Sequence, residues 1–98
     1  MLEVYGLNIP EVAVPPTPAW LQRHGGELRP ALSANVVEVW VAGQPLYRLE
    51  VRPAYDRYSC AIVDMINGRR LDDPRSVYAT AAQALNGGLE QLRQSLGW

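Results

Sequence analysis

Apolar and polar residues alternate with a period of two in the middle of the chain, from residue 36 to residue 52. Segments 36–41 and 46–52 follow this pattern, and segment 58–65 is apolar on both faces. Turn residues separate the three segments. A period of two is typical of β-strands, because successive side chains of a strand point to opposite faces of a sheet. We therefore expect three consecutive strands that form an antiparallel meander, with the third strand at a central position.

A short fourth strand is expected after the third. Asn67 and Gly68 form the dipeptide most typical of a type I′ hairpin turn, and residues 69–71 begin a return strand behind it. Asp72-Asp73-Pro74 then interrupts the return, after which residues 76–79 can resume it. The sheet is accordingly predicted to have three to four strands.

The spacing of apolar residues changes to three and four near the C-terminus, where leucines occupy positions 85, 89, 92 and 96. This spacing is typical of an amphipathic helix. Thr80 and Gln83 have the spacing of a capping box, and Gly97 has the position of a helix stop. We therefore expect a helix from Ala81 to Leu96.

Two adjacent glycines, Gly87 and Gly88, lie inside this predicted helix. Each should weaken a helix by about 1 kcal/mol relative to alanine. Gly88 lies on the leucine face, so its missing side chain allows the helix to approach either the sheet or a ring such as Trp40 or Tyr47 closely. The alternative is a kink or break at Asn86 and Gly87. We favour the continuous helix.

The first 35 residues contain five of the eight prolines, at positions 10, 15, 16, 18 and 30. This density excludes a central strand or a long helix. We expect an extended arm over residues 1–35 with a short helix near residues 18–24, which Thr17 can cap. Residues 2–9 either add an edge strand or lie along the surface. Residues 36–98 then form a single domain.

The predicted fold is α+β, with an antiparallel meander covered on one face by the C-terminal helix and preceded by a proline-rich arm. Composition supports a globular domain, because 48% of the 98 residues are hydrophobic and 19% are charged. The formal net charge of −1 provides no global field that attracts nucleic acid or an anionic membrane. The chain has no long apolar run and no basic leader, and with a single cysteine a cytoplasmic location is expected.

Residues that could carry catalysis are few. Cys60 lies in the most apolar predicted strand, where a buried and inert thiol is typical. His24 is the only histidine and follows a short surface helix. Asp72 and Asp73 are adjacent, so their side chains point apart and indicate a turn more than a metal site. We therefore expect no enzymatic activity, no cofactor and no metal.

The most promising surface is the sheet face that points away from the helix. Arg48, Glu50 and Arg52 should face outward there, together with Trp40 of the preceding strand. Arginines interleaved with aromatic rings are typical of proteins that read single-stranded RNA. Cross-strand pairs of arginine and glutamate also simply solvate a sheet face. The candidate binding residues are Trp40, Arg48, Arg52, Tyr58 and Trp98.

Residues 46–96 resemble the HicB-type antitoxin domain, in which two strands and a glycine-bearing connection lead into a helix opened by a threonine. The matching features are LYRLEVRPAYDRYSCAIVDM, then ING, then ATAAQALNGGLEQL with Thr80, Ala84 and Leu85. The chain departs from the family after the second strand, where VDMINGRRLDD replaces a Pro-Asp-Leu-Pro-Gly-Cys-like turn. It also has two alanines where the family has an acidic pair after the threonine. The resemblance implies a module that binds a small protein partner without catalysis.

The function predicted from these features is a small non-catalytic protein-interaction or assembly module. It would act through the open sheet face or a strand edge, and pairing of strand edges would make a homodimer. The alternative is binding of single-stranded nucleic acid through Trp40, Arg48 and Arg52, with Arg69 and Arg70 nearby.

Overall fold

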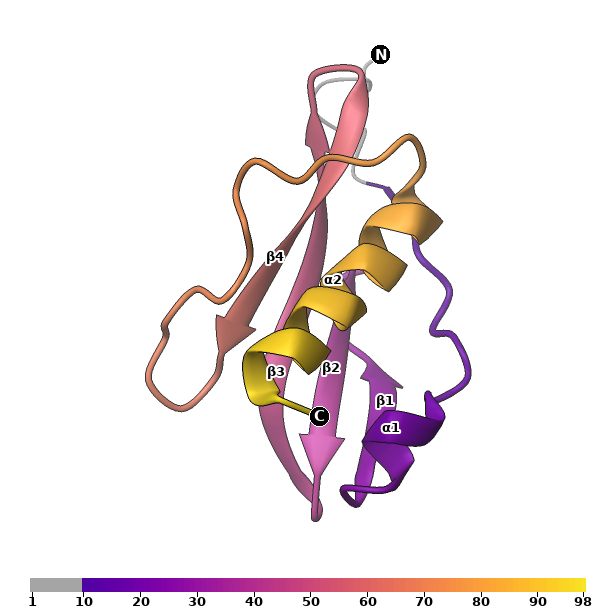
Figure 1. Cartoon of the computed structure of the whole chain (residues 1–98). Coiled ribbons are helices and arrows are strands. Elements are labelled where there is room, and N and C mark those ends of the chain that lie inside the picture. Colours follow the sequence, from indigo (N-terminus) through magenta and orange to yellow (C-terminus); the bar gives the residue numbers. More distant parts are fainter. Residues whose placement is uncertain (1–9) are drawn as a thin grey trace.

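The computed structural model describes residues 10–98, in which four strands form one antiparallel sheet and two helices lie beside it (Figure 1). The order across the sheet is β1-β2-β3-β4, so each strand pairs with its neighbour in the sequence. The strands are β1 (Gly26–Pro30), β2 (Val36–Val41), β3 (Gln44–Ala54) and β4 (Arg57–Asp64). The helices are α1 (Ala19–Gln22) and α2 (Ala81–Leu96). The predicted α+β meander with a helix on one face is confirmed.

Helix α2 begins and ends at the residues that the sequence predicts. Thr80 Oγ1 accepts a hydrogen bond from the backbone amide of Gln83 at 3.1 Å, which satisfies one of the free amides of the first turn. Gly97 has a left-handed φ of 71°, and the amide of Trp98 donates to the carbonyl of Arg93 at 3.0 Å. These are features of a Schellman ending. The helix is continuous through both glycines, as predicted.

At Gly88 the helix α2 approaches the sheet closely. A Cβ atom placed on Gly88 would overlap Sγ of Cys60 and would lie 3.2 Å from Cδ2 of Leu49. The neighbour is therefore the sheet, and neither Trp40 nor Tyr47 makes this contact. The missing side chain lets the helix and sheet backbones draw together, which adds dispersion contacts in the core.

Gly87 also has a defined neighbour. A Cβ atom there would overlap the ring of Tyr78, which therefore lies directly against the helix backbone. The two glycines thus make room for different neighbours: Gly88 packs against the sheet, and Gly87 packs against an aromatic ring.

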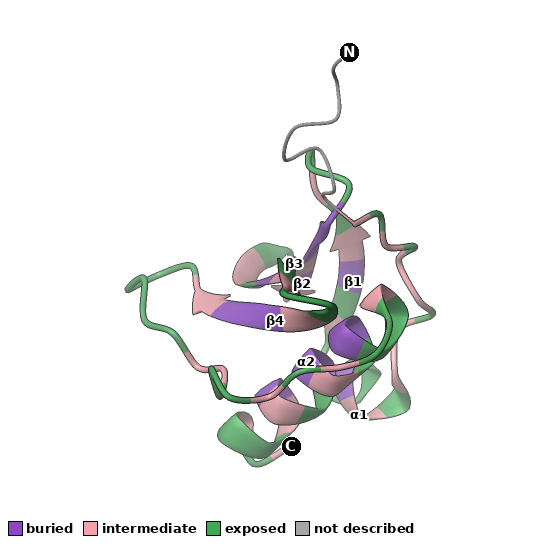
Figure 2. Cartoon of the chain, turned by 90° about the horizontal axis from the view of Figure 1, so that it is seen from above, coloured by how far each residue is buried: buried purple, intermediate pink, exposed green. Residues whose placement is uncertain are grey.

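The hydrophobic core lies between α2 and the inner face of the sheet (Figure 2). Its fully buried side chains come from the alternating inward positions of β2, β3 and β4 and from the leucine face of α2. They include Val37, Val39, Leu49, Val51, Ile62 and Leu92. Leu21 of α1 belongs to the same cluster, so both helices pack on the same side of the sheet.

The fourth strand differs from the one that was expected. The sheet is completed by β1, which precedes the predicted meander, and residues 69–71 and 76–79 form no strand. Only single bridges remain in those segments, from Arg70 to Val63 and from Tyr78 to Tyr58. The strand β1 lies within the predicted arm of residues 1–35 and forms one edge of the sheet. The other edge is β4, so the prediction that this strand is central was wrong.

The turn at Asn67 and Gly68 is also different, because only Gly68 has a positive φ, whereas a type I′ turn needs two. The carboxylate of Asp64 accepts hydrogen bonds from the amides of Ile66 and Asn67 at 2.9 and 3.3 Å. These bonds stabilise a longer loop. The type I′ geometry occurs instead between β2 and β3, where Ala42 and Gly43 have φ values of 53° and 80°.

The described part of the arm lies against the domain. The amide of Val12 donates to the carbonyl of Ala34 at 3.0 Å, and Val12 packs with Val14 against the core. Thr17 does not cap α1 as predicted, because its hydroxyl accepts a hydrogen bond from the amide of Leu28 at 3.2 Å. Residues 2–9, where an edge strand or a surface segment was expected, lie outside the described residues.

Candidate interaction surface

The second face of the sheet carries no helix in the described chain, because α1 and α2 both pack on the first. We call this second face the open face. Its members follow from the strand register and from the alternation of side chains. They are Glu27, Arg29, Val36, Glu38, Trp40, Arg48, Glu50, Arg52, Ser59, Ala61 and Val63.

Glu50 lies at the centre of the open face between two arginines of its own strand. Its carboxylate pairs with Arg48 Nη2 and with Arg52 Nε, each at 3.2 Å. The hydrogen bond from Arg52 lowers the pKa of Glu50 below its usual value. On the neighbouring strands Glu50 faces Val36 and Ala61, which are only 8% and 2% exposed although no helix covers them. We attribute their burial to the apolar stems of the arginines.

Trp40 lies near the other end of the open face, and its polar and π surfaces are both engaged. The indole Nε1 donates a hydrogen bond to Glu38 Oε1 at 2.9 Å. The guanidinium carbon of Arg29 lies 3.9 Å from the ring centroid, within the range of a cation–π interaction. Arg29 Nε also donates to Glu27 Oε2 at 2.8 Å. The ring is therefore held in one orientation on the sheet.

The charges of the open face cancel. Three arginines balance three glutamates, and each of these arginines has a carboxylate partner on the same face. Such exposed pairs contribute little to folding stability. Their effect is instead to make the face polar, ordered and neutral.

A shallow hollow adjoins the open face where the β1–β2 loop meets β2. It has a volume of about 210 Å³ and is lined by Ala31, Leu32, Ser33, Val36, Glu38 and Arg48. The side chain of Leu32 projects fully into solvent. An isolated leucine in a loop gives no periodic signal, so sequence reasoning missed this residue.

On both edges of the sheet, some outward backbone groups are bonded to other parts of the chain. On β1, the hydroxyl of Thr17 accepts the outward amide of Leu28. On β4, Tyr58 exchanges two backbone hydrogen bonds with Tyr78, at 2.9 and 2.7 Å. Backbone groups that are engaged in this way are not free to pair with a strand of another chain.

Asp72 closes the middle of the β4 edge with its side chain. Its Oδ1 accepts a hydrogen bond from the amide of Ile62 at 2.9 Å, and Arg70 Nε donates to the same oxygen at 2.7 Å. The Asp72 side chain is only 4% exposed. The hydrogen bond from Arg70 is the main cause that lowers the pKa of Asp72. The Asp72 side chain thus takes the place of a backbone acceptor for the amide of Ile62, at a position where the sequence predicted only a turn.

The structure brings three of the five candidate binding residues together on the open face, namely Trp40, Arg48 and Arg52. Tyr58 lies elsewhere, because it pairs with Pro53 in register with the inward positions and packs against the core. Trp98 lies beyond the end of α2 on the helix side of the sheet.

Trp98 joins the C-terminus to α1. Its ring stacks on His24 with 4.1 Å between ring centroids and an interplanar angle of 8°. Trp20 lies 6.4 Å from the same ring at an angle of 57°. This aromatic cluster has a packing role, because each ring is in contact with another ring of the same chain.

The single thiol is poorly suited to nucleophilic chemistry. Cys60 is 6% exposed, and burial raises its pKa to about 12. A thiol with that pKa is protonated at neutral pH, so it lacks the reactive thiolate form. Among residues 10–98, no group of three or more potential metal ligands occurs.

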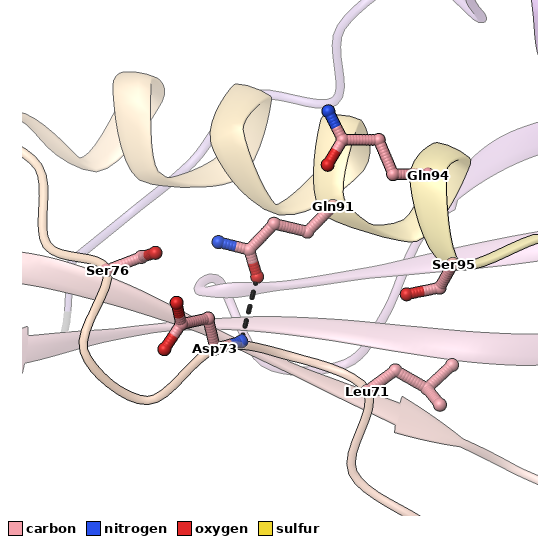
Figure 3. A pocket seen from close by; sticks show the side chains of 6 residues that line it. All are labelled: Leu71, Asp73, Ser76, Gln91, Gln94 and Ser95. Atoms are coloured by element: carbon pink, nitrogen blue, oxygen red, sulfur yellow. Dashed lines mark hydrogen bonds between the residues drawn. The ribbon is translucent and has the colours of Figure 1, made fainter.

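A groove lies between the end of α2 and the loop before it, with a volume of about 460 Å³ (Figure 3). Gln91 reaches across it, accepting a hydrogen bond from the amide of Asp73 at 3.0 Å and donating one to the hydroxyl of Tyr78 at 3.2 Å. The carboxylate of Asp73 is engaged by Arg75. The side chains of Gln91 and Asp73 in this open groove are thus engaged within the chain.

No protein family, no curated protein and no solved structure matches this chain. In the described part of the chain, no helix combines the length and the apolar character needed to cross a membrane.

Proposed function

We propose that this chain is a non-catalytic module that binds a protein partner through the open face. The observation that carries the proposal is a sheet face over which residues 10–98 place no helix. On this face Trp40, and Glu50 with Arg48 and Arg52, are already ordered. A pre-ordered aromatic anchor lowers the entropic cost of association. Leu32, fully exposed beside this face, supplies a second apolar anchor.

Binding through a strand edge is the less favoured version. Thr17 occupies the outward amide of Leu28 on one edge, and Asp72 and Tyr78 occupy the other. A partner strand would have to displace these groups before it could pair.

Binding of single-stranded nucleic acid is also less favoured. Phosphate contacts need cations that are free to exchange their counterions. Arg48 and Arg52 share the carboxylate of Glu50, and Arg29 pairs with Glu27. A phosphate would have to compete with each of these carboxylates.

The resemblance of residues 46–96 to HicB-type antitoxin domains supports a small protein as the partner. A cytoplasmic location fits this proposal, since the single cysteine forms no disulfide.

Photo-crosslinking in the cells that produce the chain tests the proposal. A photoreactive phenylalanine analogue replaces Ser59 on the open face, so the charged residues stay intact, and in a control chain it replaces exposed Gln83 on α2. Ser59 should give a discrete protein adduct that Gln83 does not give, and Trp40→Ser should reduce it. Equal adducts from both positions, or adducts that ribonuclease removes, would overturn the proposal.

A further inference from the structure

We infer that residues 69–79 form a strap that opens from the edge of β4 while the rest of the domain stays folded, and thereby controls access to this edge. The strap runs from the loop after β4 back along the strand and on to the start of α2 (Figure 1). The edge of β4 is separate from the open face, so this opening is independent of the function proposed above.

The strap is bonded to β4 near its two ends. Near its start it engages both backbone groups of Ile62, through the amide of Leu71 at 2.9 Å and the carboxylate of Asp72 at 2.9 Å. Near its end Tyr78 exchanges two backbone hydrogen bonds with Tyr58. Opening therefore has to break two small groups of hydrogen bonds.

Cys60 lies between these two attachments. Because outward groups alternate along a strand, its backbone N–H and C=O point at the strap, as those of Tyr58 and Ile62 do. Residues 73–77 of the strap form no backbone hydrogen bond with β4, and within residues 10–98 the N–H and C=O of Cys60 have no partner. Cys60 is nevertheless only 6% exposed. The strap thus completes the edge less well than a strand would, which lowers the cost of removing it.

Side-chain burial separates the strap from the core. No residue of the strap is buried, and only Leu71 and Tyr78 pack against the core, both of them partly exposed. Helix α2, in contrast, contributes five buried residues. Segments with few buried apolar contacts open at a lower free energy than the whole domain. The strap can therefore leave while α2 and the sheet stay together.

Gln91 holds the strap in the closed position. It accepts a hydrogen bond from the amide of Asp73 and donates one to the hydroxyl of Tyr78, so it joins α2 to the strap on both sides of residues 74–77 (Figure 3). Gln91 is itself only partly buried. Its two bonds can therefore be removed by substitution without a change in the core.

Amide hydrogen exchange followed by NMR tests the inference, because two sets of amides in β4 report different openings. The edge amides, those of Tyr58 and Ile62, are covered by the strap. The inner amides, those of Ala61 and Val63, pair with β3. The protection factors of the edge amides should be at least about a hundredfold below those of the inner amides. Equal protection of both sets would overturn the inference, since the strap would then open only when the whole domain unfolds.

Gln91→Ala removes the two bonds that hold the strap to α2. It should lower the protection factors of the edge amides by about tenfold or more. Gln94→Ala is the matched control, because Gln94 lines the same groove from α2 but has no hydrogen bond to the strap in the described chain. This variant should leave the edge amides unchanged. Unchanged edge amides in Gln91→Ala would also overturn the inference.

Val37→Ala separates strap opening from global unfolding. Val37 is fully buried on β2, and β3 lies between it and β4. Its truncation destabilises the whole domain but leaves the closed and open strap equally affected. The protection factors of the inner amides should fall by about tenfold or more, and those of the edge amides should stay constant. Low concentrations of urea should have the same selective effect on the unmodified chain. A parallel fall of both sets under urea would contradict a separately opening strap.

Discussion

Replacing Gly88 with alanine should destabilise the protein, although alanine is the better helix former. At an exposed helical position the substitution gains about 1 kcal/mol. At Gly88 the new methyl group would overlap Sγ of Cys60 and would lie 3.0 Å from Cβ of the same residue and 3.2 Å from Cδ2 of Leu49. Both neighbours are buried, so neither can move into solvent.

The magnitude follows from two opposing effects. Inserting one methyl group into a well-packed core typically costs about 1–3 kcal/mol. The upper end applies here, because the overlap involves a side chain close to the backbone of a sheet strand. After subtraction of the propensity gain, the expected net loss is about 2 kcal/mol in the free energy of unfolding.

A double-mutant cycle tests whether the overlap with Cys60 causes the loss of stability in Gly88→Ala. Cys60→Ala removes the overlapping sulfur and should itself cost about 1 kcal/mol of buried contact. Combined with Gly88→Ala, it should recover part of the loss, so the two effects should be non-additive by about 1 kcal/mol or more. Urea unfolding followed by circular dichroism measures all four chains, and Asn86→Ala on the exposed side of α2 is the control for helix propensity. Stabilisation by Gly88→Ala, or strict additivity with Cys60→Ala, would refute the close approach of α2 to the sheet.

Three further predictions concern single residues. The pKa of Asp72 is lowered in the folded state, mainly by Arg70, so its stabilising effect should be complete above about pH 4 and lost as the pH falls through the lowered pKa. Asp72→Asn should therefore flatten the loss of stability in an acid titration, and an unchanged acid profile would contradict this. Cys60 has its pKa raised to about 12, so a thiol reagent at pH 8 should label it only on unfolding; fast labelling of the native protein would contradict its burial. Tyr55 is a fully exposed residue with a positive φ of 59°, so Tyr55→Gly should stabilise the protein by about 1 kcal/mol in thermal unfolding, and destabilisation would show that the side chain has a structural contact.

The sequence predicts the parts of the fold that depend on local patterns. Alternation over residues 36–52 and the apolar segment 58–65 placed the three consecutive strands. The alternation also assigned Arg48 and Arg52 to the face where they are found. The position of Gly88 on the leucine face indicated a close approach, because only one side of an amphipathic helix meets the core.

Strand β1 could not be predicted in the same way. The proline density of residues 1–35 suggested an extended arm, yet Pro30 is compatible with an edge strand. The amide of Leu28 points outward to Thr17, and Pro30, two residues later, has the same orientation. The missing N–H of proline therefore falls on the free edge, where no ladder hydrogen bond is lost.

Whether Tyr58 and Trp98 belong to the candidate site could not be predicted from local sequence patterns. The connection between β3 and β4 was expected over residues 53–57, whereas the turn contains only Tyr55 and Asp56. This shorter turn fixes Tyr58 opposite Pro53, in register with the core positions. The stacking of Trp98 on His24 joins residues far apart in the sequence, so no local pattern indicates it.

The arrangement of α2 on one face of the sheet determines which residues form the open face. Proton NMR tests this arrangement most directly, through nuclear Overhauser effects between the α protons of Gly88 and the side chains of the strands. Strong effects are expected to the β protons of Cys60 and to a methyl group of Leu49, whose carbon lies 3.2 Å from the position of the missing Cβ. Effects from Gly88 to Ala61 or Val63 instead would place the helix on the opposite face and contradict the proposed interaction surface.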